Sequence, residues 1–431
     1  MTEHQEPAPH APDSRIPGHS APDNGAPSPH APDSRIPGHR APNSGAPPPH
    51  APDSGTPALQ STQHLQVGIT YNVKKNAVSS PPDAEAEYDD MDTILAIKSA
   101  LEAGGHHAEL FEADSDLPKK LIEQRPDIVF NIAEGTTGRG REAQVPALLS
   151  YLGIPYTGSD ETTMCITIDK ALTKKLVSSY RISTPMYALA TLDSSFSFSK
   201  APTPAIIKPN IEGSGKGITQ SSLVTDRAAL RQHVLDNMQT YKQDVLIEKY
   251  IPGREFTVGI LGNTGTTSNT SNTGNTSNTS NTSNTGTTSN TSTTSNTSTT
   301  SNTGSTGSLR VFPPMEIIFK DKSQSIYSYE VKKDFKKYVD YACPPDLPQD
   351  QCEKIMKTAE KIFTILGCRD CARIDFRMSP GGTLYFIEIN PLPGLAPGYS
   401  DLPILAELCG IGYNELIQSI LAHALARYAR H

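Results

Sequence analysis

The chain has no long apolar run and no dense cluster of basic residues. No stretch reaches the roughly 18 consecutive apolar residues of a membrane-spanning helix. The first residues, Met1-Thr2-Glu3-His4, lack the basic and apolar regions of a secretory signal. Asp and Glu outnumber Lys and Arg by 46 to 38, and no basic cluster alternates with aromatic residues. We therefore expect a soluble, cytoplasmic protein that binds neither membranes nor nucleic acid.

Cysteine is also scarce. The six cysteines are scattered through apolar segments of a 431-residue chain, unlike the dense frameworks of small secreted domains. The pair Cys368-Arg369-Asp370-Cys371 could be interpreted as a redox or zinc motif, but no second pair accompanies it. A helix is expected to run into a buried strand here, which favours core thiols. We expect all six cysteines to be reduced.

Two stretches contain almost no apolar residues. Residues 1–64 include 15 prolines in the first 60 positions, and residues 263–308 consist only of Asn, Thr, Ser and Gly. Neither stretch has the apolar surface to offset chain entropy, so we expect both to be disordered. Without these 64 and 46 residues, 321 of the 431 remain, which is enough for several buried cores.

The first of these tracts contains a 20-residue repeat. The segment Pro9–His19 recurs as Pro29–His39, and a truncated third copy begins at Pro49. Each full copy has one isoleucine, too few for the core of a solenoid, so a polyproline-like linker is favoured. A weak transition-metal site is the alternative, although the histidines are nine or eleven residues apart. They are His10, His19, His30, His39 and His50.

The remaining sequence alternates between short apolar strands and amphipathic helices. In residues 65–158 the pattern is a βαβ arrangement with a parallel sheet. Its strands are expected at 65–69, 107–111 and 127–132, and its helices at 91–103 and 117–124. Residues 159–249 predict a small α+β unit with helices at 162–179 and 226–239 and strands at 204–209 and 244–249.

The last part, residues 250–431, predicts a second sheet and two long helices. Strands are expected at 255–261, 309–319, 372–378 and 384–389, and helices at 349–366 and 414–428. The tract 263–308 thus lies in a hairpin connection, where a long insertion is tolerated because closure entropy grows slowly with loop length.

A glycine-rich segment follows the strand expected at 204–209. It reads Glu212-Gly213-Ser214-Gly215-Lys216-Gly217, a composition whose backbone amides can wrap a phosphate. It is not a Walker loop, because Asn210 and Gly217 stand where that loop needs a glycine and a hydroxyl residue. A flexible turn without any ligand would have the same composition.

Polar side chains also meet on the two strands near the carboxyl end. Strand alternation puts Arg373 and Asp375 on one face of the first strand, and Glu388 and Asn390 on one face of the second. Two carboxylates and an amide oxygen are ligands that Mg²⁺ prefers. An arginine–carboxylate pair on a solvated sheet face is the alternative.

Nine short motifs occur in one order along the chain. They are Pro155-Tyr156-Thr157-Gly158-Ser159, Asp169-Lys170, Ile207-Lys208-Pro209, Glu212-Gly213-Ser214, Leu246-Ile247-Glu248-Lys249, Arg254-Glu255-Phe256-Thr257-Val258, Tyr329-Glu330-Val331-Lys332, Ala372-Arg373-Ile374-Asp375 and Glu388-Ile389-Asn390. Together they resemble the ATP-grasp superfamily, and specifically the D-alanine–D-alanine ligases and their relatives.

The resemblance implies an α/β and α+β fold with three domains and ATP held between the last two. The domains would be a Rossmann-like domain at 65–158, a central ATP-grasp subdomain at 159–249 and a carboxy-terminal ATP-grasp subdomain at 250–431. It implies ATP and two Mg²⁺ or Mn²⁺ ions as cofactors, amino acids as substrates, and a homodimer. The implied reaction phosphorylates a carboxylate and lets an amine attack the resulting acyl phosphate.

The resemblance also implies a role for each matching residue. The nucleotide would contact Lys170, Lys208, Glu248, Lys249, Ile251 and Glu255, and Lys332 would reach its γ-phosphate. The mobile loop over the phosphates would contain Ser214 and Gly215. The metal ions would bind Asp375, Glu388 and Asn390, and Arg373 with the amide of Gly394 would stabilise the oxyanion.

The chain departs from the family pattern near the amino acid pockets. Glu134 stands where those ligases have a histidine, and Lys333 where they have a tyrosine that hydrogen-bonds the loop serine. Asn390 is followed by Pro391-Leu392-Pro393 instead of a hydroxyl pair.

Two further pocket residues are assigned by the same likeness. Glu87 would bind the first ammonium group, although acids at a helix start are an equal interpretation of its cluster. Ser400 would bind the acceptor carboxylate. The substrates therefore stay open between D-alanine and other amino acids or peptides, and a non-catalytic ATP-binding protein with interaction arms is the alternative of another class.

Overall fold

The computed structural model describes residues 64–75, 81, 83–193, 195–264, 309–321 and 326–429. The histidine repeats and all but the first two residues of the Asn/Thr/Ser/Gly tract lie outside these ranges. The side chain of Asn263, at the start of that tract, donates to Asp370 Oδ1 at 2.8 Å and to the carbonyl oxygen of His423 at 3.1 Å. The described part of the chain contains no helix long and apolar enough to span a membrane.

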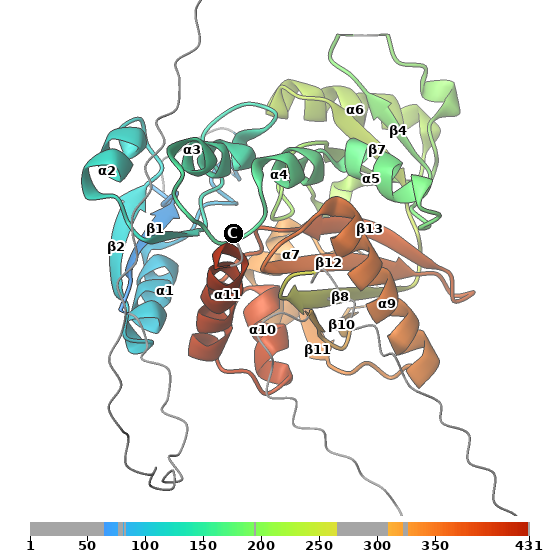
Figure 1. Cartoon of the computed structure of the whole chain (residues 1–431). Coiled ribbons are helices and arrows are strands. Elements are labelled where there is room, and N and C mark those ends of the chain that lie inside the picture. Colours follow the sequence, from blue (N-terminus) through green and yellow to red (C-terminus); the bar gives the residue numbers. More distant parts are fainter. Residues whose placement is uncertain are drawn as a thin grey trace, which may run out of the picture. The chain divides into compact units, whose positions relative to one another are not determined.

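The amino-terminal part contains a parallel three-stranded sheet (Figure 1). Its order is β2 (His107–Glu112), β1 (Gln66–Tyr71) and β3 (Ile128–Asn131). The helices α1 (Met91–Ala103) and α2 (Leu117–Gln124) connect the strands. This confirms the βαβ prediction. All of β3 and five of the six residues of β1 are buried, as expected for a parallel sheet covered on both faces.

The next segment contains more helices than the sequence predicted. The helix α3 (Gln144–Leu152) was not foreseen, and the single helix expected at 162–179 is two helices, α4 (Glu161–Ile168) and α5 (Lys170–Ser179). The break occurs because Asp169 adopts an extended backbone (ψ 99°) and its side chain accepts a hydrogen bond from the backbone N–H of Leu172. Asp169 is thus the N-cap that starts α5 and orients Lys170.

The central sheet has four antiparallel strands in the order β4 (Tyr187–Ala190), β7 (Val245–Lys249), β5 (Ala205–Pro209) and β6 (Leu223–Val224). The helix α6 (Arg227–Tyr241) packs on this sheet through its buried residues Leu230 and Val234. Short 3₁₀ turns occur at Arg141–Ala143, Phe198–Lys200 and Gln220–Ser222.

The carboxy-terminal sheet is antiparallel, with the order β11 (Val339–Ala342), β10 (Met315–Phe319), β8 (Arg254–Leu261), β12 (Cys371–Met378) and β13 (Leu384–Asn390). The short strand β9 (Arg310–Val311) also pairs with β8, with Ile260 opposite Val311. The polar tract therefore connects two antiparallel neighbours, as predicted. The strand expected at 309–319 is divided into β9 and β10 because Pro313 and Pro314, which lack an N–H donor, separate them.

Five helices accompany this sheet: α7 (Tyr329–Lys333), α8 (Phe335–Tyr338), α9 (Gln349–Leu366), α10 (Asp401–Leu408) and α11 (Tyr413–Tyr428). The buried face of α9, with Ile355, Ile362 and Phe363, packs on Ile374 and Phe376 of β12. Cys368 is buried in this cluster, and Cys371 is buried in the separate cluster that contains Leu261 and Phe312, as predicted for core thiols.

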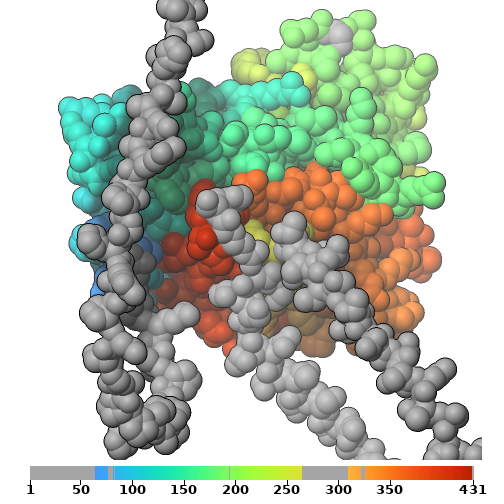
Figure 2. Space-filling view, viewed as in Figure 1, coloured from blue at the N-terminus to red at the C-terminus, as the bar shows by residue number. Residues whose placement is uncertain are grey.

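The helical layer of α4 and α5 rests directly on the carboxy-terminal sheet and α9. Thr163 Oγ1 of α4 donates to the carbonyl oxygen of Leu366 at 2.9 Å. In the space-filling view the green side chains of this layer meet the orange side chains of the last part along a continuous boundary (Figure 2). This contact brings Lys170 and Lys174 of α5 over β13.

Candidate active site

Two adjoining cavities lie where the three sheets meet. We call the first the inter-sheet cavity; it is lined by Lys208 and Glu248 of the central sheet and by Ile317, Asp375 and Glu388 of the carboxy-terminal sheet. The second, the acidic cavity, is lined by Glu87, Glu134, Glu142, Arg373, Asn390 and Ser400, among others. Tyr327, Lys332 and Asp401 line both cavities, so a molecule in one can reach a molecule in the other.

The inter-sheet cavity has aliphatic walls and a polar end. Ile206, Ile251, Ile317 and Ile387 line it, together with the chain that follows β7 at Lys249. Glu255 lies at its edge and pairs with Arg377 at 2.8 Å between carboxylate and guanidinium. A cavity lined by isoleucine side chains suits the planar base of a nucleotide.

A buried charge network forms the floor of this cavity. Lys174 has no exposed surface, and its Nζ lies 2.5 Å from Glu248 Oε1, while Lys208 Nζ lies 2.8 Å from Glu248 Oε2. Burial lowers the pKa of Lys174 to about 8. Burial alone would raise the pKa of Glu248, but the two lysines hold that pKa below its usual value. Glu248 is therefore ionised and positions Lys208 at the cavity.

The polar groups predicted on the last two strands converge. Asp375 is directly opposite Glu388, and Arg373 is directly opposite Asn390. Asp375 accepts hydrogen bonds from Thr257 Oγ1 at 2.6 Å and from Asn390 Nδ2 at 3.4 Å. The side chains of Asp375 and Glu388 are each 17 % exposed, toward the cavities. The geometry expected from strand alternation is confirmed.

Glu388 faces several positive charges. Lys170 Nζ lies 3.5 Å from Glu388 Oε2. Burial would raise the pKa of Glu388, but Lys170, Lys208, Lys332 and Arg373 hold it well below its usual range. Two carboxylates and an amide oxygen, surrounded by lysines, fit a divalent metal ion together with the phosphates of a nucleotide.

The glycine-rich loop lies over both cavities. Ser214 lines the acidic cavity and Gly215 lines the inter-sheet cavity. Both have left-handed backbone, with φ of 50° and 72°. The next glycine, Gly217, donates its N–H to Asp83 Oδ2 at 2.8 Å, so the amino-terminal part holds the end of the loop.

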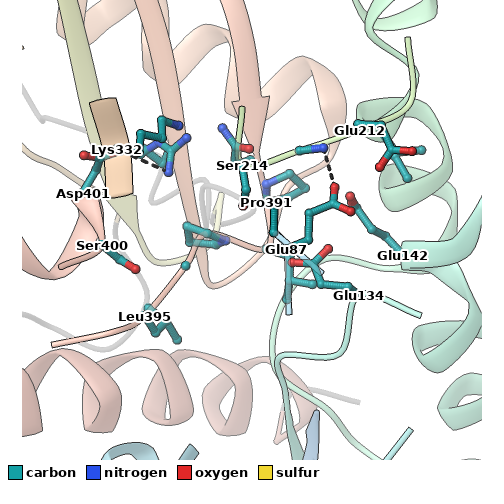
Figure 3. Close-up of a pocket in the computed structure, with 18 of the residues that line it drawn as sticks. Glu87, Glu134, Glu142, Glu212, Ser214, Lys332, Pro391, Leu395, Ser400 and Asp401 are labelled. Atoms are coloured by element: carbon teal, nitrogen blue, oxygen red, sulfur yellow. Dashed lines mark hydrogen bonds and ion pairs between the residues drawn. The ribbon is translucent and has the colours of Figure 1, made fainter. Parts of the chain in front are cut away.

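One end of the acidic cavity is formed by glutamates (Figure 3). The carboxylates of Glu87, Glu134 and Glu142 each offer an oxygen within 4.8 Å of the others. Arg141 Nη2 lies 2.6 Å from Glu87 Oε1 and 3.2 Å from Glu212 Oε2. The backbone N–H of Gly213 also donates to Glu87. A carboxylate group at this end can bind the ammonium group of an amino acid.

Ser400 and Asp401 lie at the opposite end of the acidic cavity (Figure 3). Gly394 also lines the cavity and lies against Ser400. Ser400 Oγ accepts a hydrogen bond from the backbone N–H of Ala396 at 3.1 Å. A Cβ atom at Gly394 would lie 2.8 Å from Ser400 Oγ, so a larger residue there would displace the Ser400 hydroxyl. Arg373 Nη1 lies 3.6 Å from Asp401 Oδ2, and Tyr327 donates to Asp401 Oδ1 at 3.0 Å.

Most of the residues predicted from the sequence lie at these cavities. The inter-sheet cavity contains Lys208, Gly215, Glu248, Lys249, Ile251, Glu255, Lys332, Asp375 and Glu388. The acidic cavity contains Glu87, Glu134, Lys170, Ser214, Lys332, Arg373, Asn390, Gly394 and Ser400. Lys333 is different, because it is exposed on α7 and lines neither of the two cavities. A direct substrate contact for Lys333 therefore has no support in the structure.

Several residues at the site were not predicted, among them Lys174, Arg141, Glu142 and Asp401. Lys174 follows Lys170 by one helical turn, a spacing that places both on one face of α5. Arg141 and Glu142 stand in the glycine- and arginine-rich segment after Glu134, which had no assigned role. Asp401 directly follows Ser400 and begins α10. Only the Lys170–Lys174 spacing was a signal that could have been recognised in the sequence.

Comparison with known proteins gives consistent matches. A family model described as the D-ala D-ala ligase C-terminus matches residues 193–282 and 299–422. A D-alanine–D-alanine ligase of Rhizorhabdus wittichii is 29 % identical over 341 residues, covering 77 % of this chain and 90 % of that one. The corresponding ligase of Aquifex aeolicus is 29 % identical over 330 residues, covering 76 % and 93 %. An uncharacterized protein of Sinorhizobium fredii is 27 % identical, with 77 % and 87 % coverage.

A solved structure shares the fold. The D-alanine–D-alanine ligase of Bacillus anthracis in complex with ATP superposes with a TM-score of 0.59 at 21 % identity, covering 85 % of this chain and 99 % of that one. The α/β and α+β ATP-grasp architecture is thereby confirmed, while the domain boundaries stay a prediction. In sequence and in fold the chain is therefore similar to the D-alanine–D-alanine ligases of the ATP-grasp superfamily.

Proposed function

We propose that this protein is an ATP-dependent ligase that joins two amino acids, with D-alanine–D-alanine ligation as its basic activity. The observation that carries the proposal is the junction of the two cavities at Lys332, beside Arg373, Asp375, Glu388 and Asn390. A nucleotide in the inter-sheet cavity would present its terminal phosphate there to a carboxylate in the acidic cavity. The relatives named above support the choice of reaction.

The nucleotide would bind through residues of both sheets. Its base would lie among the isoleucines, against the backbone from Lys249 to Ile251, with Glu255 at the ribose. Lys208, held by Glu248, and Lys170, beside Glu388, would contact the phosphates. Lys332 lines both cavities, so it can hold the γ-phosphoryl group in line with the attacking carboxylate.

The residues of the metal cluster fit divalent ions. Asp375, Glu388 and Asn390 would hold two Mg²⁺ or Mn²⁺ ions. When bound, the ions neutralise the charge that develops on the transferred phosphoryl group. Arg373 and the N–H of Gly394 face the acidic cavity, where they can stabilise the oxyanion formed when the amine attacks the acyl phosphate.

Water must be kept from the acyl phosphate, because hydrolysis would waste the activated carboxylate. Ser214 and Gly215 lie over both cavities, and the loop contacts Glu87 and Asp83 at its two ends. Glu87 would bind the ammonium group of the first amino acid, so its contact with Gly213 links a filled pocket to a closed loop. Ser400 would bind the acceptor carboxylate.

We expect phosphate release from ATP to depend on added amino acid. With D-alanine, Mg²⁺ and ATP, the expected products are D-alanyl-D-alanine, ADP and phosphate, measured by mass spectrometry and a coupled phosphate assay. ATP binding with no amino-acid-dependent phosphate release, across D- and L-amino acids, would contradict the proposal and indicate a binding protein. A homodimer and a cytoplasmic location stay predictions.

A further inference from the structure

The acidic cavity contains more carboxyl groups than one ammonium group can pair with. Glu87 is paired with Arg141 at 2.6 Å, and Glu212 is paired with Lys216 at 2.9 Å and with Arg141 at 3.2 Å. Two further carboxylates, Glu134 and Glu142, face the same space. Asp89 also lines the cavity. Of the two lysines there, Lys170 lies beside Glu388 and Lys332 lies over the ring of Tyr327.

Glu134 and Glu142 have no partner of their own. Among the described residues, neither side chain has a hydrogen bond or an ion pair, although Glu142 is only 9 % exposed. A buried carboxylate without a partner is costly, because it has lost its hydration and gained no compensating contact. Burial and the neighbouring glutamates raise the pKa of Glu142 to about 7 and also raise the pKa of Glu134. These groups are arranged to accept a cation from a ligand.

The position of the pair points to the amino acid rather than to the nucleotide. Both side chains line the acidic cavity and neither lines the inter-sheet cavity. Figure 3 shows them beside Glu87, at the end of the cavity away from Ser400 and Asp401. Each offers an oxygen within 4.8 Å of an oxygen of Glu87. A second positive group of the substrate would therefore lie a short distance from its α-ammonium group.

We propose that Glu134 and Glu142 bind a second amino group of the first substrate, and that this substrate is a short diamino acid such as 2,3-diaminopropionate or 2,4-diaminobutyrate. The proposal rests on the proposed function, since it names the substrate class of the same pocket. Glu87 holds the α-ammonium group, and the added pair distinguishes a diamino acid from an amino acid with an apolar side chain. Selectivity arises because an apolar side chain leaves the two carboxylates without a partner.

An organic cation fits this end of the cavity better than a metal ion. Mg²⁺ binds its oxygen ligands at about 2.1 Å, which requires a tight cluster. The three glutamate oxygens are spread over distances of up to 4.8 Å, and one oxygen of Glu87 already accepts from Arg141 and Gly213. The guanidinium of Arg141 would repel a divalent ion more strongly than a singly charged ammonium group.

The test compares two amino acids of nearly equal shape. D-2,3-diaminopropionate and D-2-aminobutyrate differ by an ammonium group in place of a methyl group, and their L-enantiomers are included. For the full chain we expect kcat/KM of ADP release, with D-alanine as acceptor, to be at least about tenfold higher for the diamino acid, equivalent to about 1.4 kcal/mol. In Glu134→Gln and Glu142→Gln, the ratio of kcat/KM for the diamino acid to kcat/KM for aminobutyrate should fall toward one. Glu109→Gln, an exposed glutamate on β2, should keep the wild-type ratio.

The affinities of the protein for diaminopropionate and aminobutyrate are also measured by calorimetry, because binding does not require turnover. If no amino acid supports ADP release but diaminopropionate still binds more tightly than aminobutyrate, the proposed ligase reaction is wrong, while the amine site formed by Glu134 and Glu142 is supported. Equal binding and equal kcat/KM for the two amino acids would overturn the amine site, even if D-alanine is ligated efficiently. The proposal would also be overturned if the protein bound Mn²⁺ in the absence of nucleotide and Glu142→Gln abolished that binding, because the glutamates would then form a metal site.

Discussion

Replacing Glu388 by Gln is expected to reduce ATP-dependent turnover by at least about a hundredfold, the upper end of what loss of a supporting metal contact costs. Glu388 faces Lys170 at 3.5 Å and is directly opposite Asp375. The surrounding cations keep its pKa low although burial would raise it, so the native group is a carboxylate. Glutamine keeps the shape but loses the charge that a metal ion and the lysines require.

The measurement is phosphate release at saturating ATP and amino acid, with circular dichroism to verify the fold. Glu353→Gln on α9 is the matched control, since Glu353 forms exposed contacts with Lys357 and Gln349, and such an exposed ion pair contributes about 0–1 kcal/mol. Wild-type turnover in Glu388→Gln would remove Glu388 from the site and leave the metal assignment without its central ligand.

Replacing Glu248 by Gln should lower the free energy of unfolding by about 3–5 kcal/mol, the usual cost of breaking a buried ion pair. Without the carboxylate, the ammonium groups of Lys174 and Lys208 would remain buried together without the anion that pairs with both. The loss is measured by chemical denaturation. ATP affinity should also fall, because Lys208 loses the contact that positions it at the inter-sheet cavity.

The double variant Lys174→Met with Glu248→Gln separates this explanation from a general packing defect. Lys174 is fully buried, so removing its charge together with that of Glu248 takes away one of the two ammonium groups that Glu248 compensates. We expect the double variant to be more stable than Glu248→Gln alone. A Glu248→Gln variant within about 1 kcal/mol of wild type would show that the network contributes little to folding.

Regular elements with strong periodicity were predictable from the sequence. The bounds of α1, α2 and α9 agree with the prediction, because each helix has a clear apolar face. The misassigned elements have local causes. Asp169 divides the helix expected at 162–179 by capping α5, and Pro313 with Pro314 divides the strand expected at 309–319. Such breaks depend on single residues that a periodic pattern does not reveal.

The part of the candidate site that lies on the neighbouring strands β12 and β13 could be predicted from the sequence. Alternation along β12 and β13 is sufficient to bring Asp375, Glu388 and Asn390 together. Contacts between distant segments were not predictable. Arg141 reaches Glu212, 71 residues away, and Lys174 Nζ donates to the carbonyl oxygen of Ile387 at 2.5 Å, 213 residues away. These pairings require the packing of the helical layer on the sheets, which sequence patterns do not define.

The structure explains one of the positions at which the sequence departs from the pattern of the D-alanine–D-alanine ligases. Glu134, which stands where the related ligases have a histidine, lies beside Glu87 and Glu142 instead of in isolation. The histidine-to-glutamate change therefore adds to a local group of carboxyl side chains in the acidic cavity. The adjoining inter-sheet cavity contains the lysine and carboxylate residues expected for nucleotide binding. Specificity is where this protein is expected to differ from its relatives.

The most direct test of the central claim follows the oxygen atoms of the substrate carboxylate. The amino acid that the enzyme uses best is labelled with ¹⁸O in its carboxylate, and the released phosphate is analysed by mass spectrometry. If the carboxylate attacks the γ-phosphoryl group and the amine then displaces phosphate, one labelled oxygen appears in each phosphate released. Phosphate that carries no label, with its new oxygen taken from water, would show that the protein hydrolyses ATP without activating a carboxylate.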